Sequence, residues 1–176
     1  MRIVVSGTHA SGKSTLIADF VAARPGYEVL PDPFEELEES ALDLDAGTFY
    51  SQLVAAAGRL RGLRPGDRVI AERGPLDFLA YLRALDDLGR PTRSPGLLDR
   101  GAAITAEAAA AVDLLVLLPL HHRDPIPVGD DEDPELRSAM DAALLGLADD
   151  PSLTGRGRIV ELTGSREDRL ARLLEA

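Results

Sequence analysis

The loop GTHASGKS at residues 7–14 constrains the fold more than any other part of the sequence. It follows a short apolar run and opens a segment with the apolar spacing of a helix. Its two glycines let the backbone curl so that successive N–H groups point at one phosphate, and the helix N-terminus adds partial positive charge. Lys13 would reach the terminal phosphates of a nucleotide, and the Ser14 hydroxyl can ligate Mg²⁺. Nine consecutive residues are expected to form this site: Gly7, Thr8, His9, Ala10, Ser11, Gly12, Lys13, Ser14 and Thr15.

The choice of basic residues supports this interpretation. Only one of the 19 basic residues is a lysine, and it is Lys13. A compact ammonium on a flexible stem fits beside phosphates in a tight loop, whereas a planar guanidinium would not. The formal net charge of −11 argues against nucleic-acid and anionic-membrane partners. The absence of cysteine excludes disulfides, Cys-zinc sites and thiol catalysis.

Predicted strands and helices alternate along the sequence, which indicates a single α/β domain over residues 1–176. Five short runs read as strands, at residues 2–6, 27–30, 68–72, 113–119 and 158–162. Three are almost continuously apolar, which is typical of parallel strands buried on both faces. Helical spacing between them implies right-handed crossovers and a three-layer sandwich. The longest apolar stretch is too short to span a bilayer and no export signal is seen, so we expect a soluble cytoplasmic protein.

Two acidic groups follow predicted strands at the edge of the sheet where ligands bind in open α/β folds. Glu72 ends the third strand and could hold Mg²⁺ through water, while Arg73 could hold a phosphate; a solvated ion pair is the alternative. Asp32 follows the second strand. It could take a proton from an attacking hydroxyl, or it could only cap a helix that begins near Phe34. Asp77 is either a helix N-terminal acid or a substrate contact.

Two further segments are candidates for the nucleotide side. The stretch at residues 120–137 is rich in Pro, Gly and Asp, and we expect a lid there. Arg123 or Arg137 would then neutralise charge on the migrating phosphoryl group, whereas His121 and His122 read as polar loop residues. Gly164 and Ser165 follow the fifth strand, and they could contact adenine or simply cap the last helix.

Two longer stretches, GTHASGKST and ERGPLDFLAYL, resemble the small P-loop nucleoside and nucleotide kinases. They are most similar to the standalone AAA-type ATP-binding proteins of that branch. The closing LTGSREDRL resembles the adenine-side loop of the same branch. The resemblance implies a five-stranded parallel sheet in the order 2-3-1-4-5, with ATP and Mg²⁺ as ligands. By likeness to deoxynucleoside kinases, Asp32 would be the general base, Glu72 the magnesium-side acid and Arg73 a positioning group.

These expectations combine into an ATP-dependent phosphotransferase that moves the γ-phosphoryl group to a small hydroxyl-bearing acceptor, such as a nucleoside or nucleotide. Lys13 and Arg123 would stabilise charge, Asp32 would deprotonate the acceptor and Arg73 would position it. Two alternatives stay open: an ATPase without a small-molecule acceptor, and a nucleotide-dependent switch that acts on a protein partner. The sequence leaves the oligomeric state open and is compatible with a homodimer.

Overall fold

Five parallel strands form the central sheet of the computed structural model, which describes residues 1–36, 45–90, 96–120 and 133–176. The strands are β1 (Arg2–Ser6), β2 (Glu28–Leu30), β3 (Val69–Glu72), β4 (Leu114–Leu117) and β5 (Arg158–Glu161). Their spatial order is β2-β3-β1-β4-β5, which confirms the predicted topology. The central strands β1, β3 and β4 are buried on both faces, as their continuous apolar runs predict.

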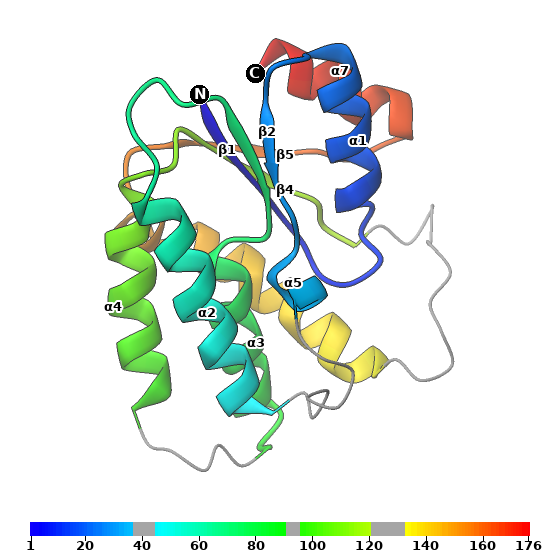
Figure 1. Ribbon diagram of the computed structural model, residues 1–176. Helices are drawn as coiled ribbons and strands as arrows, with labels where there is room; N and C mark the ends of the chain where they lie inside the picture. Colours follow the sequence, from blue (N-terminus) through cyan, green and yellow to red (C-terminus); the bar gives the residue numbers. More distant parts are fainter. Residues whose placement is uncertain (37–44, 91–95, 121–132) are drawn as a thin grey trace.

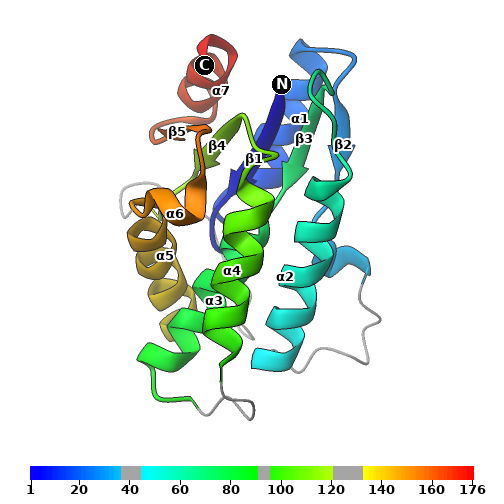
Figure 2. The ribbon, with the colours of Figure 1, turned by 90° about the vertical axis from the view of Figure 1, so that its left-hand side faces the viewer.

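Helices cover both faces of the sheet and complete the three-layer sandwich. Their bounds are α1 (Lys13–Ala23), α2 (Ala46–Arg61), α3 (Pro75–Asp87), α4 (Leu97–Ala109), α5 (Pro134–Ala148), α6 (Pro151–Thr154) and α7 (Arg166–Glu175). Helices α1 and α7 pack together on one face, around Phe20, Leu162 and Leu173 (Figure 1). Helices α2 to α6 pack on the other face, in a larger core that includes Phe49 and Phe78 (Figure 2).

Two local expectations need correction. The helical spacing of Phe49, Leu53, Val54 and Leu60 predicts one shared buried face, but Val54 is 43% exposed. It follows the fully buried Leu53 directly, and a single step turns about 100° around the helix axis, so the buried stripe continues instead through Ala56, Ala57 and Leu60. The helix expected near Phe34 is a single 3-10 turn at Pro33–Glu36.

The part of the expected lid that the structure describes is short. Asp133 caps α5 by accepting hydrogen bonds from the backbone N–H groups of Glu135 and Leu136. Arg137 therefore lies in the first turn of α5, on a regular element rather than in a loop. Residues 121–132, which include His121, His122 and Arg123, lie outside the described residues.

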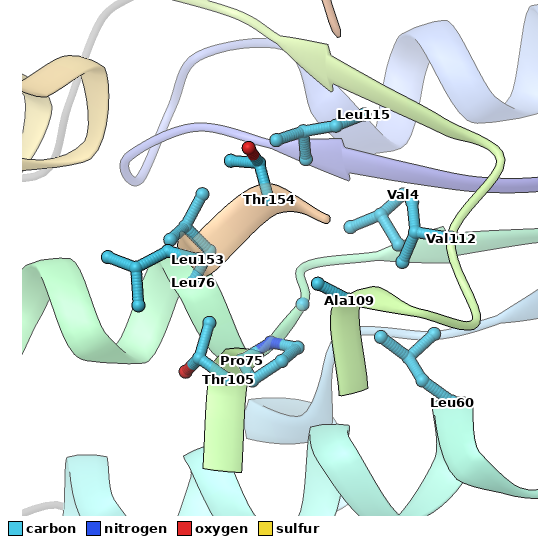
Figure 3. Close-up of a pocket in the computed structure, with 11 residues that line it drawn as sticks. Val4, Leu60, Pro75, Leu76, Thr105, Ala109, Val112, Leu115, Leu153 and Thr154 are labelled. Carbon is cyan, nitrogen blue, oxygen red and sulfur yellow. The ribbon is translucent and has the colours of Figure 1, made fainter. Parts of the chain in front are cut away.

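A small cavity of about 30 Å³ lies between the sheet and helices α3, α4 and α6 (Figure 3). Apolar side chains such as Val4, Leu60 and Leu115 form most of its lining. Thr105 also lines it, and its buried hydroxyl has no hydrogen-bond partner among the described residues.

Within the described residues, no helix is long and apolar enough to cross a membrane.

Candidate functional site

The loop between β1 and α1 has the curled backbone that its glycines predict. Gly12 has a φ of 90° and Ala10 a φ of 50°, so both lie in the left-handed region. Gly7 has no room for a side chain, because a Cβ there would lie 2.6 Å from Ser11 Oγ and 2.9 Å from a backbone oxygen. Within the described part of the chain, the buried Thr8 Oγ1 and Ser11 Oγ have no hydrogen-bond partner. A phosphate group would offer acceptors to such hydroxyls, so the loop fits an anionic ligand.

Lys13 opens α1 and is almost completely buried. Its Nζ donates a hydrogen bond to Thr8 O at 2.9 Å and lies 4.0 Å from Glu72 Oε1. Burial, with a further contribution from the nearby Arg73 guanidinium, lowers the pKa of Lys13 to about 8. The ammonium is thus held against the loop in a desolvated setting, where an added phosphate charge would be strongly favourable.

Glu72 and Ser14 bring two oxygen groups together beside the loop. Ser14 Oγ donates to Glu72 Oε1 at 2.9 Å, and Glu72 is 8% exposed at the end of β3. Burial raises the pKa of Glu72 despite the opposing effect of Lys13. A hydroxyl and a carboxylate are the hard oxygen donors that Mg²⁺ prefers, so this pair fits a magnesium site. The sequence predicts both residues as magnesium ligands, and the structure places them in contact.

Arg73 does not extend toward solvent as a free cation. Its backbone has a φ of 63°, and its side chain is 2% exposed. Nε donates to Asp32 Oδ2 at 2.7 Å, and Nη1 donates to Gly7 O at 2.9 Å. The guanidinium also lies 5.6 Å from the ring centroids of Phe34 and Tyr81. Arg73 therefore links the end of β2 to the first residue of the phosphate loop.

Asp32 caps a helical turn, which is one of the two roles that the sequence left open, and its position is compatible with the other. Its Oδ1 accepts from Phe34 N at 3.1 Å, which caps the 3-10 turn. Its Oδ2 faces Arg73, which places the carboxylate on the phosphate-loop side of the sheet edge. A capping carboxylate oxygen keeps a second lone pair, so the cap does not prevent proton transfer.

Asp77 is fully buried at the start of α3, and its carboxylate faces the entrance of the phosphate loop. Oδ1 accepts from Gly7 N at 2.9 Å, and Oδ2 accepts from Ser6 Oγ at 2.6 Å and from Gly74 N at 2.9 Å. Burial raises the pKa of Asp77, although Arg73 and these donors oppose the shift. The bond to Gly74 is the helix-cap role that the sequence considered. The bonds to Ser6 and Gly7 were not expected, because the neighbouring positions of β1 and β3 do not by themselves say which side chain meets which backbone group.

Two arginines hold the loop carbonyl groups from opposite sides. Arg137 donates from α5 to His9 O at 3.0 Å and to Ala10 O at 3.3 Å. Arg169 donates from α7 to Ser11 O and to Gly164 O, both at 3.0 Å. The sequence singled out Arg137 but missed Arg169. The one available signal was the position of Arg169 in the first turn of the helix that Gly164 precedes.

The turn after β5 is built as a helix cap. Ser165 and Asp168 form a capping box, in which each side chain accepts a hydrogen bond from the backbone N–H of the other. Gly164 has a φ of 98°, a conformation that favours glycine. Arg169 donates to Gly164 O in this turn and to Ser11 O in the phosphate loop, so the turn lies next to the loop.

The sheet order, the curled loop and the Lys13–Ser14–Glu72 group define a P-loop nucleoside triphosphate-binding fold of the nucleotide-kinase type. The chain belongs to the AAA domain family, whose model matches residues 2–169. No curated protein matches the sequence at a significant level.

Solved structures with the same fold include kinases of nucleosides and nucleotides. Deoxyadenosine kinase from M. mycoides with bound dATP has a TM-score of 0.74 at 15% identity, covering 99% of this chain and 98% of that one. Thymidylate kinase from Candida albicans has a TM-score of 0.66 at 18% identity, covering 98% and 88%. Thymidylate kinase from Ehrlichia chaffeensis has a TM-score of 0.63 at 13% identity, covering 99% and 96%. At these identities the likeness establishes the architecture.

Proposed function

We propose that the protein is an ATP-dependent phosphotransferase that transfers the γ-phosphoryl group to a small hydroxyl-bearing acceptor. One observation carries this proposal: Arg73 joins the Asp32 carboxylate, at 2.7 Å, to the carbonyl of Gly7 in the phosphate loop, at 2.9 Å. A proton acceptor is thereby held in fixed relation to the loop that would hold the phosphoryl donor. Such fixed placement is most of what phosphoryl transfer requires from a protein.

Each residue of the site has a defined task in this proposal. Asp32 takes the proton of the acceptor hydroxyl while the oxygen of the acceptor forms a bond to the γ-phosphorus. The bond from that phosphorus to the β,γ-bridging oxygen breaks, and ADP is released. Lys13 stabilises the charge on the phosphate oxygens, and Arg73 orients Asp32. Ser14 and Glu72 would hold Mg²⁺, which when bound supplies charge neutralisation at the phosphates.

The remaining assignments concern the nucleotide side. The backbone of residues 7–15 would cradle the phosphates, and Gly164 and Ser165 would lie against the purine. Arg137 supports this arrangement, because it already contacts the loop carbonyl groups. Arg123 would supply a further positive charge from the lid, as its place in the sequence suggests.

The charge balance of the site favours an acceptor that is neutral or cationic. Two cations, Lys13 and Arg73, stand beside three carboxylates, those of Asp32, Glu72 and Asp77. Because Lys13 would serve the donor phosphates and Glu72 the Mg²⁺, the acceptor side keeps Arg73 beside the carboxylates of Asp32 and Asp77, and it offers no excess positive charge to a phosphate monoester. The acceptor is therefore proposed to be a hydroxyl compound such as a nucleoside, in line with the name of the deoxyadenosine kinase neighbour.

The test is a screen of nucleosides, nucleoside monophosphates and other hydroxyl compounds for acceptor-dependent release of ADP from Mg·ATP. Asp32→Asn should lower kcat for the responding acceptor by about 10²–10⁴-fold and leave the Kd for an ATP analogue within about threefold, because general-base catalysis is worth that much. Asp149→Asn, at an exposed position at the end of α5, is the matched control and should be unaffected.

Three results would contradict the proposal. Release of ADP at the same rate without any acceptor would identify an ATPase. Nucleotide binding without turnover would point to a switch. Full transfer by the Asp32→Asn variant would remove this residue from the mechanism.

A further inference from the structure

The first residue of the phosphate loop, Gly7, is held at both of its backbone polar groups by residues from another part of the chain. The N–H of Gly7 donates to Asp77 Oδ1 at 2.9 Å, and its C=O accepts from Arg73 Nη1 at 2.9 Å. Arg73 lies in the turn that joins β3 to α3 and Asp77 in the first turn of α3, 66 and 70 positions away along the chain. Gly7 itself has no side chain with which to fix its orientation.

We propose that Asp77 is a positioning residue that presets the phosphate loop for nucleotide binding by fixing the backbone of Gly7. Its carboxylate is 0% exposed and accepts three hydrogen bonds, of which two come from the loop entrance at Ser6 and Gly7. Three donors converge on this one buried group, and each would be left unsatisfied without it, so the entrance is held firmly. This inference rests on the proposed role of the loop in binding a nucleotide.

Geometry explains why one carboxylate can act on the whole loop. The loop leaves β1 with Gly7 already fixed, and it is constrained further along by Arg137 and Arg169 at the His9, Ala10 and Ser11 carbonyl groups. Hydroxyls of Thr8 and Ser11 lie buried between these anchors. A loop held at its entrance needs little further ordering when a ligand arrives, and preorganisation of this kind appears directly in affinity.

Arg73 complements Asp77, because it holds the carbonyl group of Gly7. It lies 3.8 Å from Asp77 Oδ1 and donates to Asp32 as well as to Gly7, so the same pair of residues sets the loop and the acceptor-side acid. The pair is enclosed by aromatic rings and by the turn at Gly74, whose N–H is the third donor to Asp77. Gly74 also packs tightly, since a Cβ there would lie 2.9 Å from Val4 Cγ1. The turn cannot easily shift to compensate for a change at Asp77.

The experiment compares Asp77→Asn with two other variants, using a non-hydrolysable ATP analogue with Mg²⁺ as the probe. Asn has the same shape, but its NH₂ group cannot accept the bonds that Oδ2 now receives. Asp150→Ala removes the N-cap of α6, so it destabilises the fold away from the loop and controls for stability alone. Ser6→Ala removes a single donor to Asp77 and is the milder variant.

Two quantities are measured: the Kd for the analogue by titration calorimetry, and hydrogen exchange of the amides at Gly7, Gly74 and residues 8–12 without nucleotide. Asp77→Asn should weaken binding at least about tenfold, the equivalent of about 1.4 kcal/mol, and should speed exchange across residues that Asp77 does not touch. Ser6→Ala should weaken binding about two- to fivefold. Asp150→Ala should change neither the Kd nor the exchange rates, even if its melting temperature falls as far as that of Asp77→Asn.

The inference is overturned if Asp77→Asn binds the analogue as tightly as the unaltered protein, or if faster exchange is confined to Gly7 and Gly74. Equal losses in Asp77→Asn and Asp150→Ala would also overturn it, because stability alone would then explain them. If Asp77→Asn does not fold, Ser6→Ala decides the question by the same criteria. None of these readouts needs an acceptor, so failure of phosphoryl transfer would refute the proposed function and leave this inference standing.

Discussion

The buried ammonium of Lys13 predicts that nucleotide affinity depends on pH above neutrality. Burial and Arg73 lower the pKa of Lys13 to about 8, against the opposing influence of Asp77, Glu72 and Asp32. A triphosphate beside Nζ favours the charged form, so binding raises this pKa and takes up a proton when Lys13 is neutral beforehand. The sign is therefore fixed: affinity falls as the pH rises through about 8, because the neutral amine must first be protonated.

The expected size follows from that pKa. At about one pH unit above it, roughly one tenth of the lysine is charged in the free protein, so the Kd should rise about tenfold between about pH 7 and about pH 9. The triphosphate itself is fully ionised over most of this range and contributes little. Calorimetry in two buffers of different ionisation enthalpy should also detect uptake of about half a proton near pH 8.

Lys13→Arg is the matched control, because a guanidinium stays charged over the whole range. It should bind more weakly, since its planar fork fits the tight loop poorly, but its Kd should not follow the pH. A flat Kd for the unaltered protein would refute the assignment of the lowered pKa to Lys13. An equal slope in Lys13→Arg would show that another group titrates.

Two substitutions test the packing of the protein, one in the apolar cavity and one in the phosphate loop. Thr105→Val replaces a buried hydroxyl without a partner in the described structure by a methyl group of similar shape, so it should raise the free energy of unfolding by about 1 kcal/mol in urea denaturation; a lower midpoint would contradict this. Gly7→Ala would put a Cβ 2.6 Å from Ser11 Oγ and 2.9 Å from Leu118 O, so analogue binding should weaken at least about tenfold with the circular dichroism spectrum retained. Unchanged binding would show that the loop tolerates a side chain.

Local signals predicted most of the architecture. The continuous apolar runs of β1, β3 and β4 identify buried parallel strands, and the loop at residues 7–14 sets the fold through its resemblance to P-loop kinases. The edge strands were placed to within one or two residues, although their exposure weakens the apolar signal. The short helix α6 was missed, because a four-residue element leaves too brief a pattern to detect.

The sequence by itself determined what the phosphate loop is, because its function depends on backbone curvature, two glycines and one lysine within eight consecutive residues. Only the tertiary structure decided the duties of Arg73, Asp77 and Arg169. Arg73, which the sequence predicts as a ligand of phosphate, links Asp32 to Gly7 in the structure. Asp77 and Arg169 likewise serve loop groups that lie far from them along the chain. Such contacts are fixed by which strands are neighbours and which helix ends meet the loop, and no local pattern of residues encodes that.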